Sequence, residues 1–420
     1  MKPNYVVVAL VLVTFFMVSF FTNILGPIFP QLISSFNIGL TLAGLFPFAF
    51  FIAYGVMSIP AGLLVQRFGE KRVMLGAFVL AGSGALLFAV APVFLVAMLA
   101  LFLIGTAMAM LQVAINPLLR RSGGSAHFAV FSVLAQLLFG AAASLSPWVY
   151  VTLATQIQAS PADFSWIPSS MPWLSMYWLF ALLSVVMLIW ISLVRLQAVE
   201  RSDEEKLSVK ACMVYFRDPV VVRFFFAIVA YVALEQGIAN SISVFLQTYH
   251  QIETAQSAQV ISRFWMMLTL GCVLGLLLLK LLDAKLVLLL FCLGAAMSLV
   301  VALTGSAQTA LLAFPLSGFF LSVMWSVLFS LALNSVPSGH GTVSGVLCTG
   351  IVGGALASPL IGILTQLSGS LQLACFILLL PLGYIAWIAW WAKPIVKNHT
   401  IKTFWQKKAL STEQQEVANQ

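Results

Sequence analysis

The chain has 420 residues, 62% of them hydrophobic and only 8% charged, and its mean hydropathy is +1.07. Soluble domains carry about 25% charged residues, so this composition excludes a soluble globular protein. The apolar runs are continuous and about 20 residues long, as in helical spans, whereas the strands of a membrane barrel are shorter and alternate. The composition predicts an all-α, polytopic membrane protein. The net charge of +8 lies in short loops and the tail, so we expect no nucleic-acid partner.

Twelve apolar segments predict twelve transmembrane helices in two six-helix bundles. The N-terminal bundle, residues 1–196, is expected to hold helices at about 5–25, 40–65, 73–91, 94–118, 128–153 and 176–196. Pro27 and Pro30 are expected to end the first helix. A charged cytoplasmic linker, 197–220, follows. The C-terminal bundle, 221–392, is expected to hold helices at about 221–246, 257–279, 286–304, 309–333, 342–365 and 371–392, before a cytoplasmic tail, 393–420.

Lys and Arg gather in every second connection between these segments and in the tail. The opposite connections, at about 26–39, 92–93, 154–175, 247–256, 305–308 and 366–370, contain neither residue. Basic loops stay on the cytoplasmic side, so both termini are predicted to be cytoplasmic in a multi-pass protein of the inner membrane. The apolar N-terminal run has no small-residue cleavage site and is interpreted as a retained first helix.

Glu235 is the only carboxylate in the middle of a long apolar segment. An ionisable group at bilayer depth costs at least about 2.5–3.5 kcal/mol and indicates a functional site. The alternative is a glutamate that is kept protonated or satisfied by a neighbouring helix. The five cysteines are scattered in the sequence, and no histidine pairs with another ligand at metal spacing, so we expect neither a metal nor another cofactor.

Residues 62–72 and 275–285 form an internal repeat with an offset of 213 residues (275 minus 62). A glycine, a base, an acid and a final base match in order, and the last of these pairs Arg72 with Lys285. Many transporters repeat a six-helix half and bind substrate at the midplane between halves. The offset places Asn23 opposite Gln236, beside Glu235. The alternative is that any two basic turns look alike.

The turn with Gly62, Arg67, Gly69, Lys71 and Arg72 resembles the signature between helices 2 and 3 of the major facilitator superfamily, with Gln66 in place of its usual acid. The fucose permease type, the fucose–galactose–glucose:proton symporter family, is a closer likeness. Its motifs resemble these segments: Ala114-Ile115-Asn116-Pro117, His127-Phe128, Tyr231-Val232 with Glu235, and helices 10 and 11. The resemblance implies two pseudo-twofold-related bundles, a gating role for the turn, and sugar transport coupled to protons.

The chain departs from the fucose permease type where that family carries carboxylates in helices 1 and 4. Asn23 and Gln112 stand there, and an amide cannot release a proton near neutral pH. Only Gln136 remains of the polar motif in helix 5, and Trp325 lies in the altered motif of helix 10. The coupling mechanism therefore does not follow from the resemblance, and a proton or sodium gradient acting through Glu235 stays an expectation.

These observations predict a secondary active or facilitative transporter, not an enzyme, that moves a small polar solute, most simply a monosaccharide, as a monomer. The predicted substrate-binding residues are Asn23, Gln112, Asn116, Gln136, Gln236, Asn240 and Trp325. The alternative is an exporter of drugs or amphipathic metabolites, which would use a cavity rich in Phe and Met. No HExxH, GxSxG or pair of intramembrane carboxylates indicates an intramembrane enzyme.

Several of these residues have a purely structural alternative. Asn116 with Pro117 would then only end a helix, Gln112 would join two helices, and Trp325 would face lipid or the core. Arg263 is interpreted as reaching outward along the lipid rather than meeting a substrate. Gly350, Gly353 and Gly354 are interpreted as close-packing positions.

Overall fold

The computed structural model describes residues 4–123, 128–194, 215–337 and 340–395. Within these residues all regular structure is helical. Most of the predicted linker and most of the predicted tail lie outside the described residues. The N-half, as we call the helices before the linker, consists of α1 (Tyr5–Thr22), α2 (Leu25–Phe36), α3 (Leu40–Ala43), α4 (Leu45–Phe68), α5 (Glu70–Val90), α6 (Phe94–Gly123), α7 (Phe128–Ala159) and α8 (Leu174–Leu193).

The C-half consists of α10 (Pro219–His250), α11 (Thr254–Leu281), α12 (Ala284–Thr304), α13 (Ala307–Leu321), α14 (Met324–Asn334), α15 (His340–Thr349), η2 (Gly350–Gly353), α16 (Gly354–Ser368), α17 (Leu371–Cys375), η3 (Phe376–Leu378) and α18 (Leu379–Trp391). The described residues of the two halves contain 12 candidate membrane spans. The prediction of twelve transmembrane helices is confirmed.

Five of the spans are interrupted, which the hydropathy pattern did not predict. The expectation that Pro27 and Pro30 end the first span is wrong: α1 ends at Thr22, and α2 continues to Phe36. Pro27 lies in the first turn of α2, where its missing N–H has no intrahelical partner to lose. The other interruptions separate α3 from α4, α13 from α14, α15 from α16, and α17 from α18.

The turn after α4 is much shorter than the predicted loop of residues 66–72. Gly69 alone separates α4 from α5, with φ +80°, a conformation that glycine adopts without strain. The ends of the spans near this turn also carry Arg67, Lys71, Lys285 and Lys393. We call this end of the bundle the basic end, and the other the opposite end.

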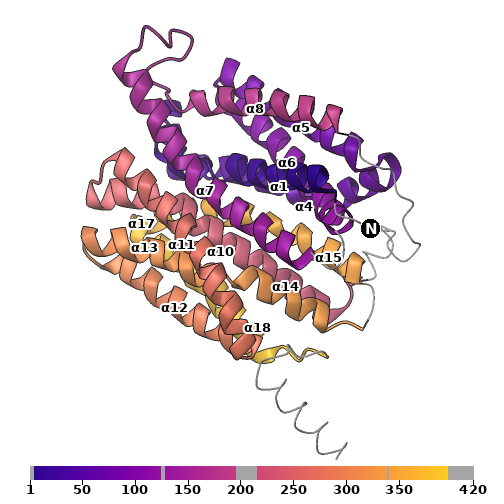
Figure 1. The fold of residues 1–420 in the computed structure, drawn as a ribbon. Helices are drawn as coiled ribbons and strands as arrows, with labels where there is room; N and C mark the ends of the chain where they lie inside the picture. Colours follow the sequence, from indigo (N-terminus) through magenta and orange to yellow (C-terminus); the bar gives the residue numbers. More distant parts are fainter. Residues whose placement is uncertain (1–3, 124–127, 195–214, 338–339, 396–420) are drawn as a thin grey trace, which may run out of the picture.

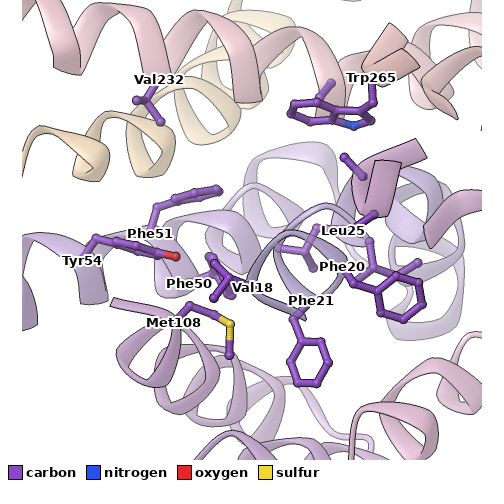
Figure 2. Packing of buried hydrophobic residues seen from close by; sticks show 14 of the residues in the cluster. Val18, Phe20, Phe21, Leu25, Phe50, Phe51, Tyr54, Met108, Val232 and Trp265 are labelled. Atoms are coloured by element: carbon purple, nitrogen blue, oxygen red, sulfur yellow. The ribbon is translucent and has the colours of Figure 1, made fainter. Parts of the chain in front are cut away.

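Figure 1 shows the two halves as two groups of helices lying side by side, the N-half in indigo to magenta and the C-half in pink through orange to yellow. They meet along α7 and α11, along α2 and α10, and along α4 and α16. Between α7 and α11, the Ser262 hydroxyl donates to the carbonyl of Ser144 at 2.5 Å. In Figure 2, Phe51 and Tyr54 of α4 lie on the N-half side and Val232 of α10 lies on the C-half side.

Near the opposite end the two halves pack backbone against backbone. A Cβ at Gly44 would lie 2.7 Å from the backbone of Ser358 and Pro359, and one at Gly26 would lie 2.8 Å from the carbonyl oxygen of Ala239. Helices in lipid associate through small residues that allow such close approach. The structure is therefore closed between the halves near this end.

A lysine makes an equivalent contact in each half at the basic end. The Lys71 ammonium donates to the carbonyls of Ser192 and Val194, at 2.9 and 2.8 Å, at the end of α8. The Lys285 ammonium donates to the carbonyls of Trp390 and Ala392, at 3.1 and 2.6 Å, at the end of α18. The predicted repeat pairs Lys285 with Arg72. In the structure Lys285 instead makes the contact that Lys71 makes, because α5 begins directly after Gly69 and each lysine is the second residue of its helix.

Candidate functional site

Glu235 lies near the middle of α10, half-buried and one helical turn after Tyr231. The Tyr231 hydroxyl donates a 2.5 Å hydrogen bond to Glu235 Oε1. Residues four apart lie on the same face of a helix, so α10 itself positions the pair. This hydrogen bond directs the carboxyl group toward the same side as the Tyr231 ring.

An aromatic row continues from Tyr231 onto α14. The ring centroids of Tyr231 and Trp325 are 6.1 Å apart, and those of Trp325 and Phe329 are 5.8 Å apart in a stacked arrangement. Trp325 lies in the first turn of α14, directly after the interruption at Ser322 and Val323. The break in the span therefore brings the indole ring alongside the face of α10 that carries Glu235.

A cavity of about 370 Å³ lies between the two halves beside this row. The residues that line it are Gln136 of α7 and, on α14, Trp325, Ser326, Phe329, Ser330, Leu333 and Asn334. Its volume is in the range that small ligands occupy. It runs along α14 from the aromatic row to Asn334, the last residue of this helix, at the basic end. Gln136 and Trp325 were predicted as site residues, and the cavity brings them together.

Sequence analysis missed the polar side of this cavity. Ser326, Ser330 and Asn334 follow one another at intervals of four residues and form one polar stripe on an otherwise apolar helix. The Asn334 amide donates to the Ser330 hydroxyl at 3.4 Å. The four-residue spacing is the signal that could have found them, since it aligns hydroxyls and an amide along one helix face.

The predicted residues of the first and seventh spans lie outside the lining of the cavity. Asn23 is 4% exposed; its amide nitrogen donates to the carbonyl and hydroxyl of Ser19, while its Oδ1 is buried with no hydrogen-bond partner among the described residues. Gln236 is buried, and the Asn240 amide donates to the Ser358 hydroxyl at 3.3 Å. Gln236 and Asn240 belong to the stretch of α10 that leads toward the closed opposite end.

Other predicted positions take varied places. Gln112 is half-buried in α6 and has a partner, whereas the side chain of Asn116 lies outside the described residues. Arg263 is exposed on α11 and does not line the cavity. The close-packing interpretation of the glycines is confirmed: a Cβ at Gly353 would lie 2.0 Å from the carbonyl oxygen of Val229, and one at Gly354 would lie 2.7 Å from the Phe51 ring.

Two residues of the predicted gating turn, Arg67 and Lys71, contact other residues of the N-half. The Arg67 guanidinium lies 5.3 Å from the centroid of the Phe68 ring, and Lys71 caps the end of α8. Gly62 is buried in α4, while Arg72 is exposed. Among the described residues, no cluster of three His, Cys, Asp or Glu side chains could hold a metal ion.

The sequence profile of the Major Facilitator Superfamily matches residues 11–351. The chain belongs to this superfamily. It is therefore a multi-pass membrane transporter and not an enzyme. A glucose/galactose transporter of Brucella abortus biovar 1 (strain 9-941) is 28% identical over 377 residues, which cover 89% of this chain and 90% of that relative.

A second relative of this superfamily member is the L-fucose-proton symporter of Escherichia coli (strain K12), 23% identical over 87% of this chain and 88% of the symporter. The crystal structure of the transporter FucP in its outward conformation superposes with a TM-score of 0.66 at 21% identity, covering 91% of this chain and 97% of FucP. The structural match shows the fold, and the relatives bear out the resemblance to the fucose permease type.

Proposed function

We propose that this superfamily member carries a monosaccharide of the glucose or galactose class across the inner membrane by alternating access. The observation that supports this most directly is the cavity between the halves, which offers an indole ring at Trp325, an amide at Gln136 and the hydroxyls of Ser326 and Ser330. A sugar presents an apolar face to an aromatic ring and hydroxyls to groups that both donate and accept hydrogen bonds. The glucose/galactose transporter and the L-fucose-proton symporter among its relatives agree with this substrate class.

In this mechanism the two bundles, residues 1–196 and 221–392, rock against each other around the solute as a monomer in the bilayer. The basic end faces the cytoplasm with both termini, in keeping with the positive-inside rule. The present structure, closed near the opposite end, is then the inward-facing state. Asn23, Gln236 and Asn240 lie on the closed side, and they join Gln112 and Asn116 in lining the passage when that end opens.

Glu235 is the group through which a proton or sodium gradient drives transport in this proposal. Its carboxyl is held by Tyr231, whose ring lies against Trp325 at the cavity. Protonation or cation binding neutralises the carboxylate and removes the cost of moving a charge through a dry interface. The amides of Asn23 and Gln112 bind hydroxyls but carry no proton.

Counterflow in proteoliposomes tests the substrate class. Vesicles preloaded with unlabelled D-galactose are expected to take up labelled D-galactose and D-glucose, and Gln136→Ala is expected to reduce uptake about tenfold by removing hydrogen bonds to the solute. Gln308→Ala is the matched control, because Gln308 is an exposed amide at the opposite end. Lack of counterflow for all monosaccharides, together with transport of a lipophilic cation, would replace the sugar proposal with drug export.

A further inference from the structure

A second cavity, of about 450 Å³, lies at the basic end of the C-half, where it begins next to the first cavity: Asn334 lines the first and Ser335 the second. The residues that line it are Val220 at the start of α10, Ser335 after α14, and Trp390, Trp391 and Lys393 at the end of α18. It lies within one half, so the rocking of the halves does not require it. Its volume is in the range that binds small ligands or headgroups.

Cations gather around this cavity. Lys393 lines it and is exposed, and no hydrogen bond or ion pair of its ammonium is recorded within the described part of the chain. The Arg223 guanidinium lies 4.6 Å from the ring centroid of Trp391. The Lys285 ammonium binds the carbonyls of Trp390 and Ala392. One cation thus lines the cavity, and two more contact the tryptophans of its lining.

Two nearby acids offset only part of this charge, and each of them caps a helix. Asp218 accepts from the backbone N–H of Val220 at 2.8 Å, and Asp283 accepts from that of Lys285 at 2.8 Å. A carboxylate at an N-cap is directed at the helix end. Arg217 also lies next to Asp218 in the sequence. The local balance stays positive, with Lys393 as the cation nearest the open space.

The aromatic residues place the cavity at the depth of lipid headgroups. Trp390 is 76% exposed and Trp387 is 40% exposed, and Trp387 stacks on Trp391 with ring centroids 5.8 Å apart. Exposed tryptophans of a membrane protein gather at the boundary between hydrocarbon and water. Basic pockets between helices at this level bind anionic headgroups. A soluble anion would gain nothing from the exposed indoles.

We infer that the cavity between the start of α10 and the end of α18 binds the phosphate-bearing headgroup of an anionic phospholipid. The phosphate lies near Lys393 and Arg223, and the acyl chains descend along the exposed faces of Trp387 and Trp390. The bound lipid holds the cytoplasmic ends of α10 and α18 together, next to the point where Tyr384 donates to the carbonyl of Arg223 at 3.1 Å.

Native mass spectrometry of the delipidated full-length protein tests this site. Titration with dioleoylphosphatidylglycerol is expected to show one saturable lipid, bound at least tenfold more tightly than dioleoylphosphatidylcholine. Lys393→Gln is expected to weaken phosphatidylglycerol binding about fivefold, since one lysine near an anionic surface contributes that much. Lys393→Arg is expected to restore binding. Lys393 is exposed, so its replacement leaves the fold intact.

Arg67→Gln provides the matched control. Arg67 also lies over an aromatic ring at the basic end, but it does not line the cavity. Equal binding of the two lipids, or an equal effect of Lys393→Gln and Arg67→Gln, would overturn the proposal. Binding of inorganic phosphate as tight as that of phosphatidylglycerol, and lost in Lys393→Gln, would assign the site to a soluble anion and overturn the lipid assignment.

Discussion

The two halves are alike at the basic end and different at their centres. In each half a lysine at the start of the third span binds two carbonyls at the end of the sixth, through Lys71 in one and Lys285 in the other. At the centre, the first span of the N-half breaks at Asn23, whereas α10 runs unbroken through Glu235.

The halves therefore share a structural contact at the basic end but carry chemically different groups at their centres. An amide offers the same donor and acceptor at every pH, but a carboxylate changes its charge when it binds a proton or a cation. The lysine contacts join the third span to the sixth in the same way in each half. Energy coupling, in the proposed mechanism, resides in the C-half alone.

Replacing Glu235 with glutamine is expected to have the largest effect. The change removes the only titratable carboxylate in the interior of the described spans, so uptake driven by an ion gradient is expected to fall to the equilibrium level. Sugar counterflow, which needs no gradient, is expected to continue. Both are measured in proteoliposomes. Glu253→Gln, at an exposed glutamate before α11, is expected to change neither. Undiminished accumulation in Glu235→Gln would make the carrier's coupling independent of the C-half acid.

A side chain at Gly44 is expected to block the closed interface near the opposite end. The Cβ of valine there would meet the backbone of Ser358 and Pro359 at 2.7 Å, which no rotamer change relieves. Overpacking costs about 1–3 kcal/mol, so the closed state becomes about 5- to 150-fold less populated. Counterflow slows accordingly if transport passes through this state. Gly383→Val is the control, because nothing lies within 4 Å of its Cβ. Normal counterflow with Gly44→Val would contradict closure at this contact.

Trp325→Ala is expected to raise the KM for sugar about tenfold while leaving gradient dependence intact. Aromatic contacts are worth about 0.5–1.5 kcal/mol beyond the area they bury, and Trp325 is the only indole in the cavity between the halves. Trp325→Phe is expected to retain part of the affinity. Trp148→Ala serves as the control, since Trp148 is 60% exposed on α7. An unchanged KM would remove the ring from the sugar site while leaving the role of Glu235 open to its own test.

The spans and the close-packing glycines could be predicted because hydropathy and residue size act locally. The interruptions could not. Residues 321–324 read Leu-Ser-Val-Met, with no proline or glycine, yet the span breaks there where α11 presents Gly271 and Gly275 to Ser322 and Val323. That contact is set by tertiary packing. It also decides which face of α14 meets the cavity.

Only part of the candidate site could be predicted, again because tertiary contacts cannot be seen in the sequence. Glu235 stands out in any hydropathy profile, and Gln136 and Trp325 do line the cavity. An amide in a span, however, can satisfy itself locally, as Asn23 does on Ser19, or join two helices, as Asn240 does with Ser358. Sequence shows the polar group but not the partner, so it cannot separate the packing amides from those that face the cavity.

The smallest effect is expected from the feature the halves share. Lys71→Gln and Lys285→Gln each remove a cation from a helix C-terminus, where it contributes about 0.3–1 kcal/mol. Each variant is expected to lower the thermal midpoint of the purified protein by about 1–3 °C. Arg72→Gln, at an exposed position with no recorded contact to a helix end, is expected to lower it less. Similar losses for the two lysines would show that the halves use the same clamp with the same strength. A loss confined to one of them would mean that the halves differ at their basic ends as well as at their centres, and the asymmetry could no longer be assigned to Glu235 alone.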